Sequence, residues 1–172
     1  MPLDTPRQQE LLAPVKLRYV VISLFVALIF ILLPWRDLRG VPDLVALVIV
    51  FWAIHQPRQV GMGAAFLAGL LVDAANAVLF GQHALAYAFL AFAAYALHRR
   101  MLWFGPWPQA LHVLLLLLVA QLLMVMVRMY AGSAFPGWSY FLGSVIAAAL
   151  WPLATLVLLA PQRLAASKNE PI

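Results

Sequence analysis

Apolar residues fill six long runs of the chain, and short polar or proline-containing breaks separate them. The runs lie at residues 19–33, 43–55, 60–80, 82–97, 110–130 and 138–160. An α-helix needs about 20 apolar residues to cross the hydrocarbon core of a membrane. The pattern therefore predicts an all-α fold, a polytopic transmembrane bundle of about six helices at 19–160, with polar tails at 1–18 and 161–172.

The second run is too short to cross a membrane as a straight helix. It spans about 20 Å at 1.5 Å per residue, whereas the hydrocarbon core is about 30 Å thick. Pro42 and Asp43 mark its start, because a proline costs no hydrogen bond in a first helical turn. We expect this helix to lie where the bilayer is thin, to extend irregularly inside protein, or to be re-entrant. In the last run, Pro152 predicts a kink.

The composition lies outside the range of soluble domains. Hydrophobic residues make up 66% of the 172 residues and charged residues 10%, against about 45–50% and about 25% in soluble proteins. A soluble fold of this length could not bury so much apolar surface, so lipid must cover the remainder. The chain contains no cysteine, which excludes disulfides, thiolate metal sites and cysteine nucleophiles.

Basic residues predict the orientation of the bundle and do not indicate nucleic-acid binding. Lys and Arg number 11 against 6 Asp and Glu, and they form short clusters between the apolar runs. With the N-terminus inside, the inner segments hold eight and the outer segments three: Arg7, Lys16, Arg18, Arg58, Arg99, Arg100, Arg163 and Lys168 against Arg36, Arg39 and Arg128. Because inner loops carry the excess of Lys and Arg, we expect both termini in the cytoplasm.

Asp73 is the acid that lies well inside an apolar run. A carboxylate at that depth is costly and commonly faces the interior of a helix bundle. Every fourth residue around it is small, which lets another helix approach closely: Gly61, Ala65, Gly69, Ala77 and Gly81. Asn76 lies on a neighbouring part of the same face. We favour a polar clamp, satisfied by a neighbouring hydroxyl, amide or Arg, over a proton or ligand site and over a partner-helix site.

The other polar residues give little support for catalysis or metal binding. No histidine forms a close helical pair with another histidine or an acid, so metal-ligand spacing is absent at His55, His83, His98 and His112. Arg128 either snorkels to the outer surface or acts as a counter-charge for Asp73. The serines lack a Gly-x-Ser-x-Gly context. We therefore expect no catalytic centre, cofactor or metal.

An ordered set of polar and aromatic positions begins with Gly69-Leu70-Leu71-Val72-Asp73 and continues in residues 79–87, which read Leu-Phe-Gly-Gln-His-Ala-Leu-Ala-Tyr. This set resembles the signature of MreD, the family of bacterial rod shape-determining membrane proteins. Other positions fit the proteobacterial members: Pro42, Asp43, Phe51, Trp52, His55, Gln56, Pro57, His98, Arg99, Arg100, 109–112, 135–138 and 150–154. The resemblance covers nearly everything from Pro42 to Arg163. Residues 76–80 depart from it, since many members carry more Gly or Ser there.

The resemblance implies a non-enzymatic inner-membrane part in the machinery that elongates the peptidoglycan wall. MreD proteins accompany MreC, a bitopic periplasmic protein, and the cytoplasmic actin-like filament MreB, and act with a RodA-type glycosyltransferase and its penicillin-binding transpeptidase. The family fold is similar to the six-helix substrate-binding subunits of energy-coupling-factor vitamin transporters. Structural importance carries over to the matching positions, which together with Arg128 form the candidate partner or structural polar site: Gly69, Asp73, Gly81, Gln82, His83 and Tyr87.

Three functions are compatible with these observations. The leading hypothesis is a scaffold whose small-residue helix faces and interfacial aromatics bind partner helices, chiefly that of MreC. The alternative is a substrate-capturing subunit of a small-molecule, vitamin-type transporter, which predicts a pocket lined by convergent polar groups. Its candidate lining is the polar set of the outer half: Asp73, Asn76, Gln82, His83 and Arg128. An intramembrane enzyme is disfavoured, because the sequence offers no acid–base or nucleophile pair.

Overall fold

The computed structural model describes residues 16–33 and 40–167, with side chains as far as 162. The regular secondary structure of these residues is entirely helical: α1 (Leu17–Leu32), α2 (Leu44–His55), α3 (Met62–Asn76), α4 (Gln82–Met101), α5 (Pro106–Tyr130), the 3-10 helix η1 (Trp138–Phe141), α6 (Leu142–Ala149) and α7 (Trp151–Ser167). The all-α prediction is confirmed for this part of the chain. The orientation prediction also used Lys and Arg residues at 1–15, 34–39 and 168–172, which lie outside the described residues.

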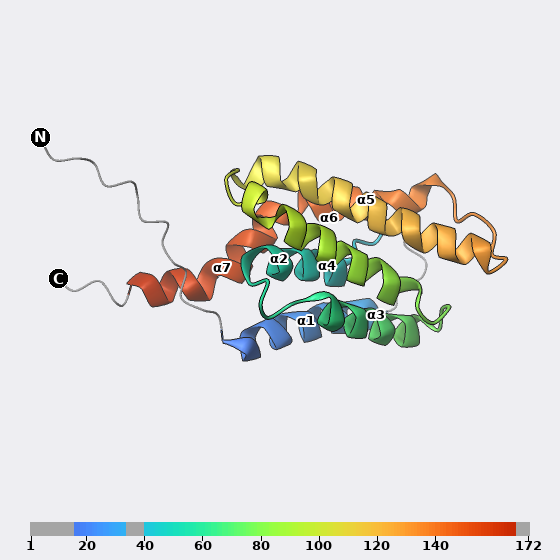
Figure 1. Ribbon diagram of the computed structural model, residues 1–172, viewed down its shortest axis with the longest axis horizontal. Coiled ribbons are helices and arrows are strands. Elements are labelled where there is room, and N and C mark those ends of the chain that lie inside the picture. The colour runs from blue at the N-terminus through green and yellow to red at the C-terminus, as the bar shows by residue number, and fades with distance from the viewer. Residues whose placement is uncertain (1–15, 34–39, 168–172) are drawn as a thin grey trace, which may run out of the picture.

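The helices run along the long axis of an elongated bundle (Figure 1). The start of α1 and the end of α7 lie at the same end of the molecule, and α3 and α4 form a tight hairpin. The short helix α2 lies between α1 and α5 and contacts α1, α4, α5, α6 and α7. The described chain therefore begins and ends at one end of the bundle, as an even number of passes requires.

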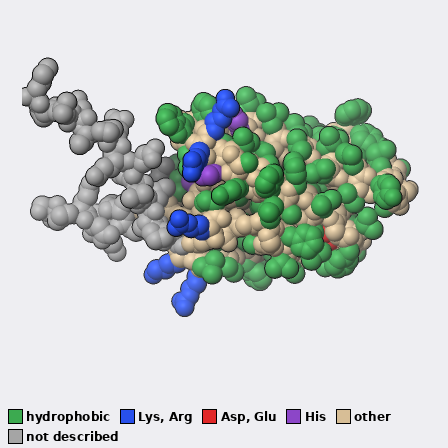
Figure 2. All heavy atoms as spheres, viewed as in Figure 1, with side chains coloured by type: hydrophobic (Ala, Val, Ile, Leu, Met, Phe, Trp, Pro, Cys, Tyr) green, Lys and Arg blue, Asp and Glu red, His purple; other side chains and the backbone are tan. Residues whose placement is uncertain are grey.

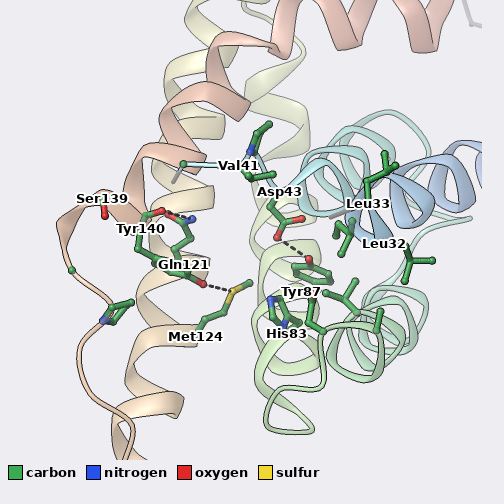
Figure 3. Close-up of a pocket in the computed structure, with 18 of the residues that line it drawn as sticks. Leu32, Leu33, Val41, Asp43, His83, Tyr87, Gln121, Met124, Ser139 and Tyr140 are labelled. Atoms are coloured by element: carbon green, nitrogen blue, oxygen red, sulfur yellow. Dashed lines mark hydrogen bonds between the residues drawn. The ribbon is translucent and has the colours of Figure 1, made fainter. Parts of the chain in front are cut away.

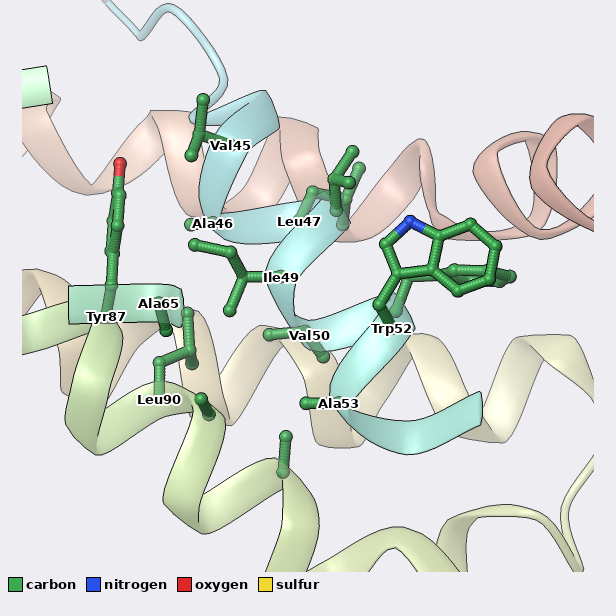
Figure 4. Packing of buried hydrophobic residues seen from close by; sticks show 14 of the residues in the cluster. Val45, Ala46, Leu47, Ile49, Val50, Trp52, Ala53, Ala65, Tyr87 and Leu90 are labelled. Carbon is green, nitrogen blue, oxygen red and sulfur yellow. The ribbon is translucent and has the colours of Figure 1, made fainter. Parts of the chain in front are cut away.

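Helix α2 is buried on all sides, which explains how so short an apolar helix fits the fold. Every residue from Val45 to Ile54 is at most 9% exposed. Its side chains point in all directions into the core, where they meet Tyr87 and Leu90 of α4 (Figure 4). A helix that is apolar all round needs apolar neighbours all round. Of the three expectations for this segment, the structure supports a short helix that lies inside protein.

The outer surface of the bundle is apolar. Large hydrophobic side chains that are at least 50% exposed occur on α1, α3, α4, α5 and α7: among them Phe25, Leu67, Phe92, Leu111, Met126 and Val157. Hydrophobic side chains cover most of the face seen in Figure 2. A soluble domain rarely exposes a continuous apolar patch of this kind, so this surface suits contact with lipid.

The predicted spans and the observed helices differ in length. Among the described residues, α5 is the single helix that is long and apolar enough to cross a membrane by itself. The last predicted span is a bent pair, Trp138–Ala149 and Trp151–Gln162, whose parts meet at 44°. Helices α1, α2 and α3 are apolar but shorter, at 16, 12 and 15 residues. Six full-length spans are therefore not present in the described chain.

Three helix ends lie at other positions than the predicted spans, or confirm a predicted break. Helix α3 stops at Asn76, before the predicted end at residue 80, because Ala77 adopts a left-handed conformation with φ of 51°. The break before α7 lies at Leu150, two residues before Pro152, which confirms the predicted kink. The missing N–H of a proline removes a hydrogen bond to the preceding turn. Helix α7 then continues through Pro161 to Ser167, beyond the expected start of the polar tail.

Gln109 joins the α4–α5 turn to α7. Its buried amide nitrogen donates to the carbonyl oxygens of Met101 and Phe104 at 3.0 and 2.9 Å, and its carbonyl oxygen accepts from Trp151 Nε1 at 3.1 Å. All three partners would lose their hydrogen bond to this side chain in a leucine variant. Gln109 and Trp151 both belong to the family pattern of the sequence, but the pattern did not indicate that their side chains are hydrogen-bonded.

We expect Gln109→Leu to destabilise the bundle by about 2 kcal/mol or more, since buried groups that lose their partners cost about 1–3 kcal/mol each. Trp151→Phe should cost less, because it removes a single donor. Thermal unfolding in detergent of both single variants and of the double variant measures their coupling. The double variant should lose less stability than the sum of the single losses. Additive losses would contradict the hydrogen bond between the two side chains.

Candidate functional site

A buried carboxylate near the end of α3 caps the start of α4. The side chain of Asp73 is 0% exposed. One carboxylate oxygen accepts from the backbone N–H groups of Gly81 at 2.8 Å and Ala84 at 3.4 Å. The other accepts from the backbone N–H of His83 at 2.9 Å and from His83 Nδ1 at 2.7 Å. Asp73 thus supplies acceptors to a helix N-terminus, whose first N–H groups have no partner within their own helix.

The local sequence brings this carboxylate and this helix end together. Ala77 and Gly81 adopt positive φ values of 51° and 99°, and the chain reverses between them. The reversal places the N-terminus of α4 against the last turn of α3. A helix N-terminus carries a partial positive charge and attracts an anion. The carboxylate is therefore stabilised electrostatically as well as by four hydrogen bonds.

Gly69 lets the two helices of the hairpin touch. A Cβ atom built on Gly69 would lie 2.4 Å from Ala84 Cα and 2.5 Å from Ala84 N. The helix that approaches the small-residue face is therefore α4 of the same chain. Ala65, Gly69 and Asp73 of that face are buried, whereas Gly61 and Ala77 are exposed. At Gly69, the helix that packs against this face therefore belongs to the same chain and not to a partner protein.

Among the described residues, the side chain paired with Asp73 is His83 and not Arg128. The two residues are ten positions apart, so neither helical spacing nor strand spacing could have indicated the pair. Arg128 lies in the last turn of α5 and is half-buried. Gln82, the first residue of α4, is buried, and its carbonyl oxygen Oε1 has no hydrogen-bond partner.

A second carboxylate links α2 to α4. Asp43 caps α2 by accepting from the backbone N–H of Ala46 at 2.9 Å, which confirms the predicted helix start. Its other oxygen accepts from the hydroxyl of Tyr87 at 2.7 Å. Tyr87 is fully buried. The sequence indicated Asp43 as a helix start and Tyr87 as a family position, but their separation of 44 residues concealed the contact.

A large cavity opens beside these carboxylates. Its volume is about 1090 Å³, and it is formed by the ends of α1 and α3, the starts of α2 and α4, the middle of α5 and residues 136–140. Asp43, Tyr87, His83, Gln121 and Tyr140 lie around it (Figure 3). Asn76 completes the amide lining, and Trp138 adds an aromatic ring. The cavity thus gathers one carboxylate, two amides, an imidazole and three aromatic rings.

Gln121, like Tyr140, is a lining residue that the sequence did not indicate. It lies on α5, is 8% exposed, and donates from Nε2 to the carbonyl oxygen of Tyr140 at 3.2 Å. Its carbonyl oxygen has no hydrogen-bond partner in the part of the chain that the structure describes. The amide cannot be turned over, because two carbonyl oxygens would then face each other. A glutamine within a long run of Leu, Val and Met was the available signal in the sequence.

The opposite end of the bundle is basic. Lys and Arg side chains gather at one end of the face shown in Figure 2. The residues concerned lie at the start of α1, in the α2–α3 turn and at the end of α4: Lys16, Arg18, Arg58, Arg99 and Arg100. Exposed Trp103 and Trp107 follow that end, while exposed Tyr130 and Trp138 lie at the cavity end. Aromatic residues at both ends are typical of the two membrane–water interfaces.

No group of three His, Cys, Asp or Glu side chains within the described ranges is placed to hold a metal ion. The polar groups of the cavity end are instead arranged as helix caps and as a hydrogen-bonding lining. A buried central helix, an apolar exterior and Lys and Arg side chains gathered mainly at one end are features of a helical membrane protein.

Comparison with known proteins places this membrane bundle in one family. Residues 10–159 match the family described as rod shape-determining protein MreD. The chain is 30% identical over 149 residues to the rod shape-determining protein MreD of Haemophilus influenzae, covering 81% of this chain and 88% of that relative. The chain belongs to the MreD family, and a role in determining rod shape follows.

No solved structure matches the chain significantly. The expected similarity to the substrate-binding subunits of vitamin transporters therefore has no support from structural comparison.

Proposed function

We propose that this protein is a non-enzymatic scaffold of the rod complex that binds MreC in the inner membrane. Membership of the MreD family is the observation that carries the proposal. The same complex would contain MreB and the RodA-type glycosyltransferase with its penicillin-binding transpeptidase as indirect partners. The scaffold acts by stoichiometric binding, which holds the bitopic partner upright and couples wall synthesis outside the membrane to filaments inside it.

The bundle suits this role because its fold is fixed internally and its exterior is free for partners. The Asp73 cap and the Gly69 contact hold α3 against α4, and Asp43 with Tyr87 holds α2 against α4. Apolar side chains remain exposed on the outer faces of α1, α3 and α5. Helices in lipid associate through close packing and not through hydrophobic driving force, so these faces are available to the helix of a partner.

The proposal includes an orientation with both termini in the cytoplasm. The described basic end of the bundle contains the start of α1 and the end of α4. Cytoplasmic segments carry the excess of Lys and Arg. The cavity and the Asp73 cap would then lie at the periplasmic end, on the side where MreC has its soluble domain.

The test is purification of the tagged full-length protein from its own host in a mild detergent, with co-eluting proteins identified by mass spectrometry. A tagged membrane protein of similar size from the same host serves as the control. We expect MreC and wall-synthesis enzymes to be enriched over the control. Enrichment of paired ATPases with a coupling membrane subunit, and not of MreC, would replace the scaffold with the transporter alternative.

Capture of a small molecule is kept as a second candidate function because of the cavity. The transporter alternative predicted a pocket with convergent polar groups. Asn76 and His83, two residues of its expected lining, do line the cavity, whereas Asp73, Gln82 and Arg128 do not. A binding cavity is compatible with a scaffold as well as with a carrier, so the partners recovered in the purification decide between the two.

A further inference from the structure

The cavity at the Asp43 end has a lining that is rich in acceptors and contains no Lys or Arg among the described residues. Asp43 contributes a carboxylate whose two hydrogen bonds come from a backbone amide and a tyrosine hydroxyl. Neither donor is positively charged, and the histidine of the lining pairs with Asp73 instead. A carboxylate near a low-dielectric interior is stabilised strongly by a cation.

Gln121 adds an acceptor that no group among the described residues satisfies. The side chain is more than nine-tenths buried, and its carbonyl oxygen lacks a partner while its amide nitrogen is held by Tyr140. An unsatisfied buried acceptor costs about 1–3 kcal/mol. A hydrogen-bond donor on a bound ligand would reach this oxygen after a small movement of the lining side chains. The new hydrogen bond would recover that energy.

The rest of the lining favours the same chemistry. His83 Nδ1 lies 2.7 Å from a carboxylate oxygen of Asp73, so His83 is paired with Asp73 and not with Asp43. Tyr87, Trp138 and Tyr140 provide aromatic rings, and ring faces attract cations. The C-terminal end of α1 and the residue after it contribute Ile31, Leu32 and Leu33, which suit an apolar chain attached to a polar head.

We propose that this cavity binds a primary ammonium group, with Asp43 as its anionic contact and Gln121 as an acceptor. The group is carried either by the head of a phospholipid such as phosphatidylethanolamine or by a small free amine. A primary ammonium has N–H groups that donate to these acceptors, whereas a quaternary ammonium has no N–H group to donate. The site is separate from the exposed helix faces of the scaffold, so its existence does not depend on the proposed partners.

The lipid arm of the experiment uses the purified full-length protein and native mass spectrometry. Equal amounts of phosphatidylethanolamine and phosphatidylcholine with identical acyl chains compete for binding. The wild-type protein should retain phosphatidylethanolamine in preference by about tenfold or more, as expected for a charge-assisted hydrogen bond. A second arm titrates free ethanolamine and choline by calorimetry. A preference among lipids alone identifies a lipid head group, and a preference for free ethanolamine alone identifies a soluble amine.

Two variants connect the preference to the cavity. Asp43→Asn removes the charge while its oxygen and amide can still bond to Ala46 and Tyr87, and it should abolish the preference. Gln121→Leu should weaken it several-fold. Gln162→Leu is the matched control, because Gln162 is also buried and has no side-chain hydrogen-bond partner among the described residues, but it does not line the cavity. Circular dichroism and melting verify that each variant is folded.

Equal binding of the primary and quaternary probes in both arms would overturn the proposal. A full preference in folded Asp43→Asn would overturn it as well. If Asp43→Asn does not fold, Gln121→Leu decides: an unchanged preference there contradicts the site, and a weakened one supports it.

Discussion

Replacement of Gly69 by alanine is expected to unfold the α3–α4 hairpin almost as effectively as replacement by leucine. The added Cβ itself would lie 2.4 Å from Ala84 Cα and 2.6 Å from the carbonyl carbon of His83. These are backbone atoms, so no side-chain rotation can relieve the overlap. The helices must separate, and separation carries the N–H groups of α4 away from Asp73. We expect a loss of more than about 3 kcal/mol, since overpacking and a broken buried cap act together.

Gly63 provides the matched control on the same helix. A Cβ at Gly63 meets nothing within 4 Å, and Gly→Ala in an exposed helix is neutral or stabilising by up to about 1 kcal/mol. Thermal unfolding in detergent should therefore separate Gly69→Ala from Gly63→Ala by a large difference in Tm. A Gly69→Ala protein that melts with the wild type would show that the helices are not in backbone contact.

The same contact changes how loss of a partner should be interpreted. The sequence left a partner-helix site on the small-residue face open. Because Gly69 faces α4 of its own chain, loss of a partner protein from a Gly69→Leu variant would follow from a disrupted hairpin. Substitution of exposed residues on α1 or α3 is the better way to find a partner surface.

The sequence was sufficient for features that depend on local pattern. Apolar runs predicted the helices, Asp43 predicted a cap, and Pro152 predicted a bend. The four-residue spacing of small residues around Asp73 predicted that this face packs against a helix. Each of these signals lies within one helix or at its end, where 3.6-residue periodicity and capping rules apply.

The contacts that build the cavity end depended on tertiary structure and could not be predicted in this way. Asp73 reaches His83 because Ala77, a non-glycine residue, adopts a left-handed conformation. Tyr87 reaches Asp43 only because α2 lies inside the bundle. Helix lengths were misjudged for a related reason: hydrophobicity does not distinguish a helix that faces lipid from one buried in protein.

Asp73→Leu is expected to cause the largest loss of stability among single substitutions of polar residues. Leucine leaves three backbone N–H groups at the start of α4 without acceptors, each at about 1–3 kcal/mol, and removes the anion from the helix N-terminus. Asp73→Asn should be intermediate. Its oxygen can still accept from Gly81 and Ala84, and its amide can donate to His83 Nδ1, but the backbone N–H of His83 loses its acceptor.

His83→Ala should be the mildest of the three, because it removes one of the four hydrogen bonds and leaves the backbone contacts of Asp73 in place. The order of Tm in detergent should be wild type, His83→Ala, Asp73→Asn and then Asp73→Leu. Since the family determines rod shape, host cells that carry each variant as the single copy should lose their rod shape in the same order. Equal phenotypes for Asp73→Asn and Asp73→Leu would contradict the cap, because only the amide can replace part of the carboxylate's hydrogen bonding.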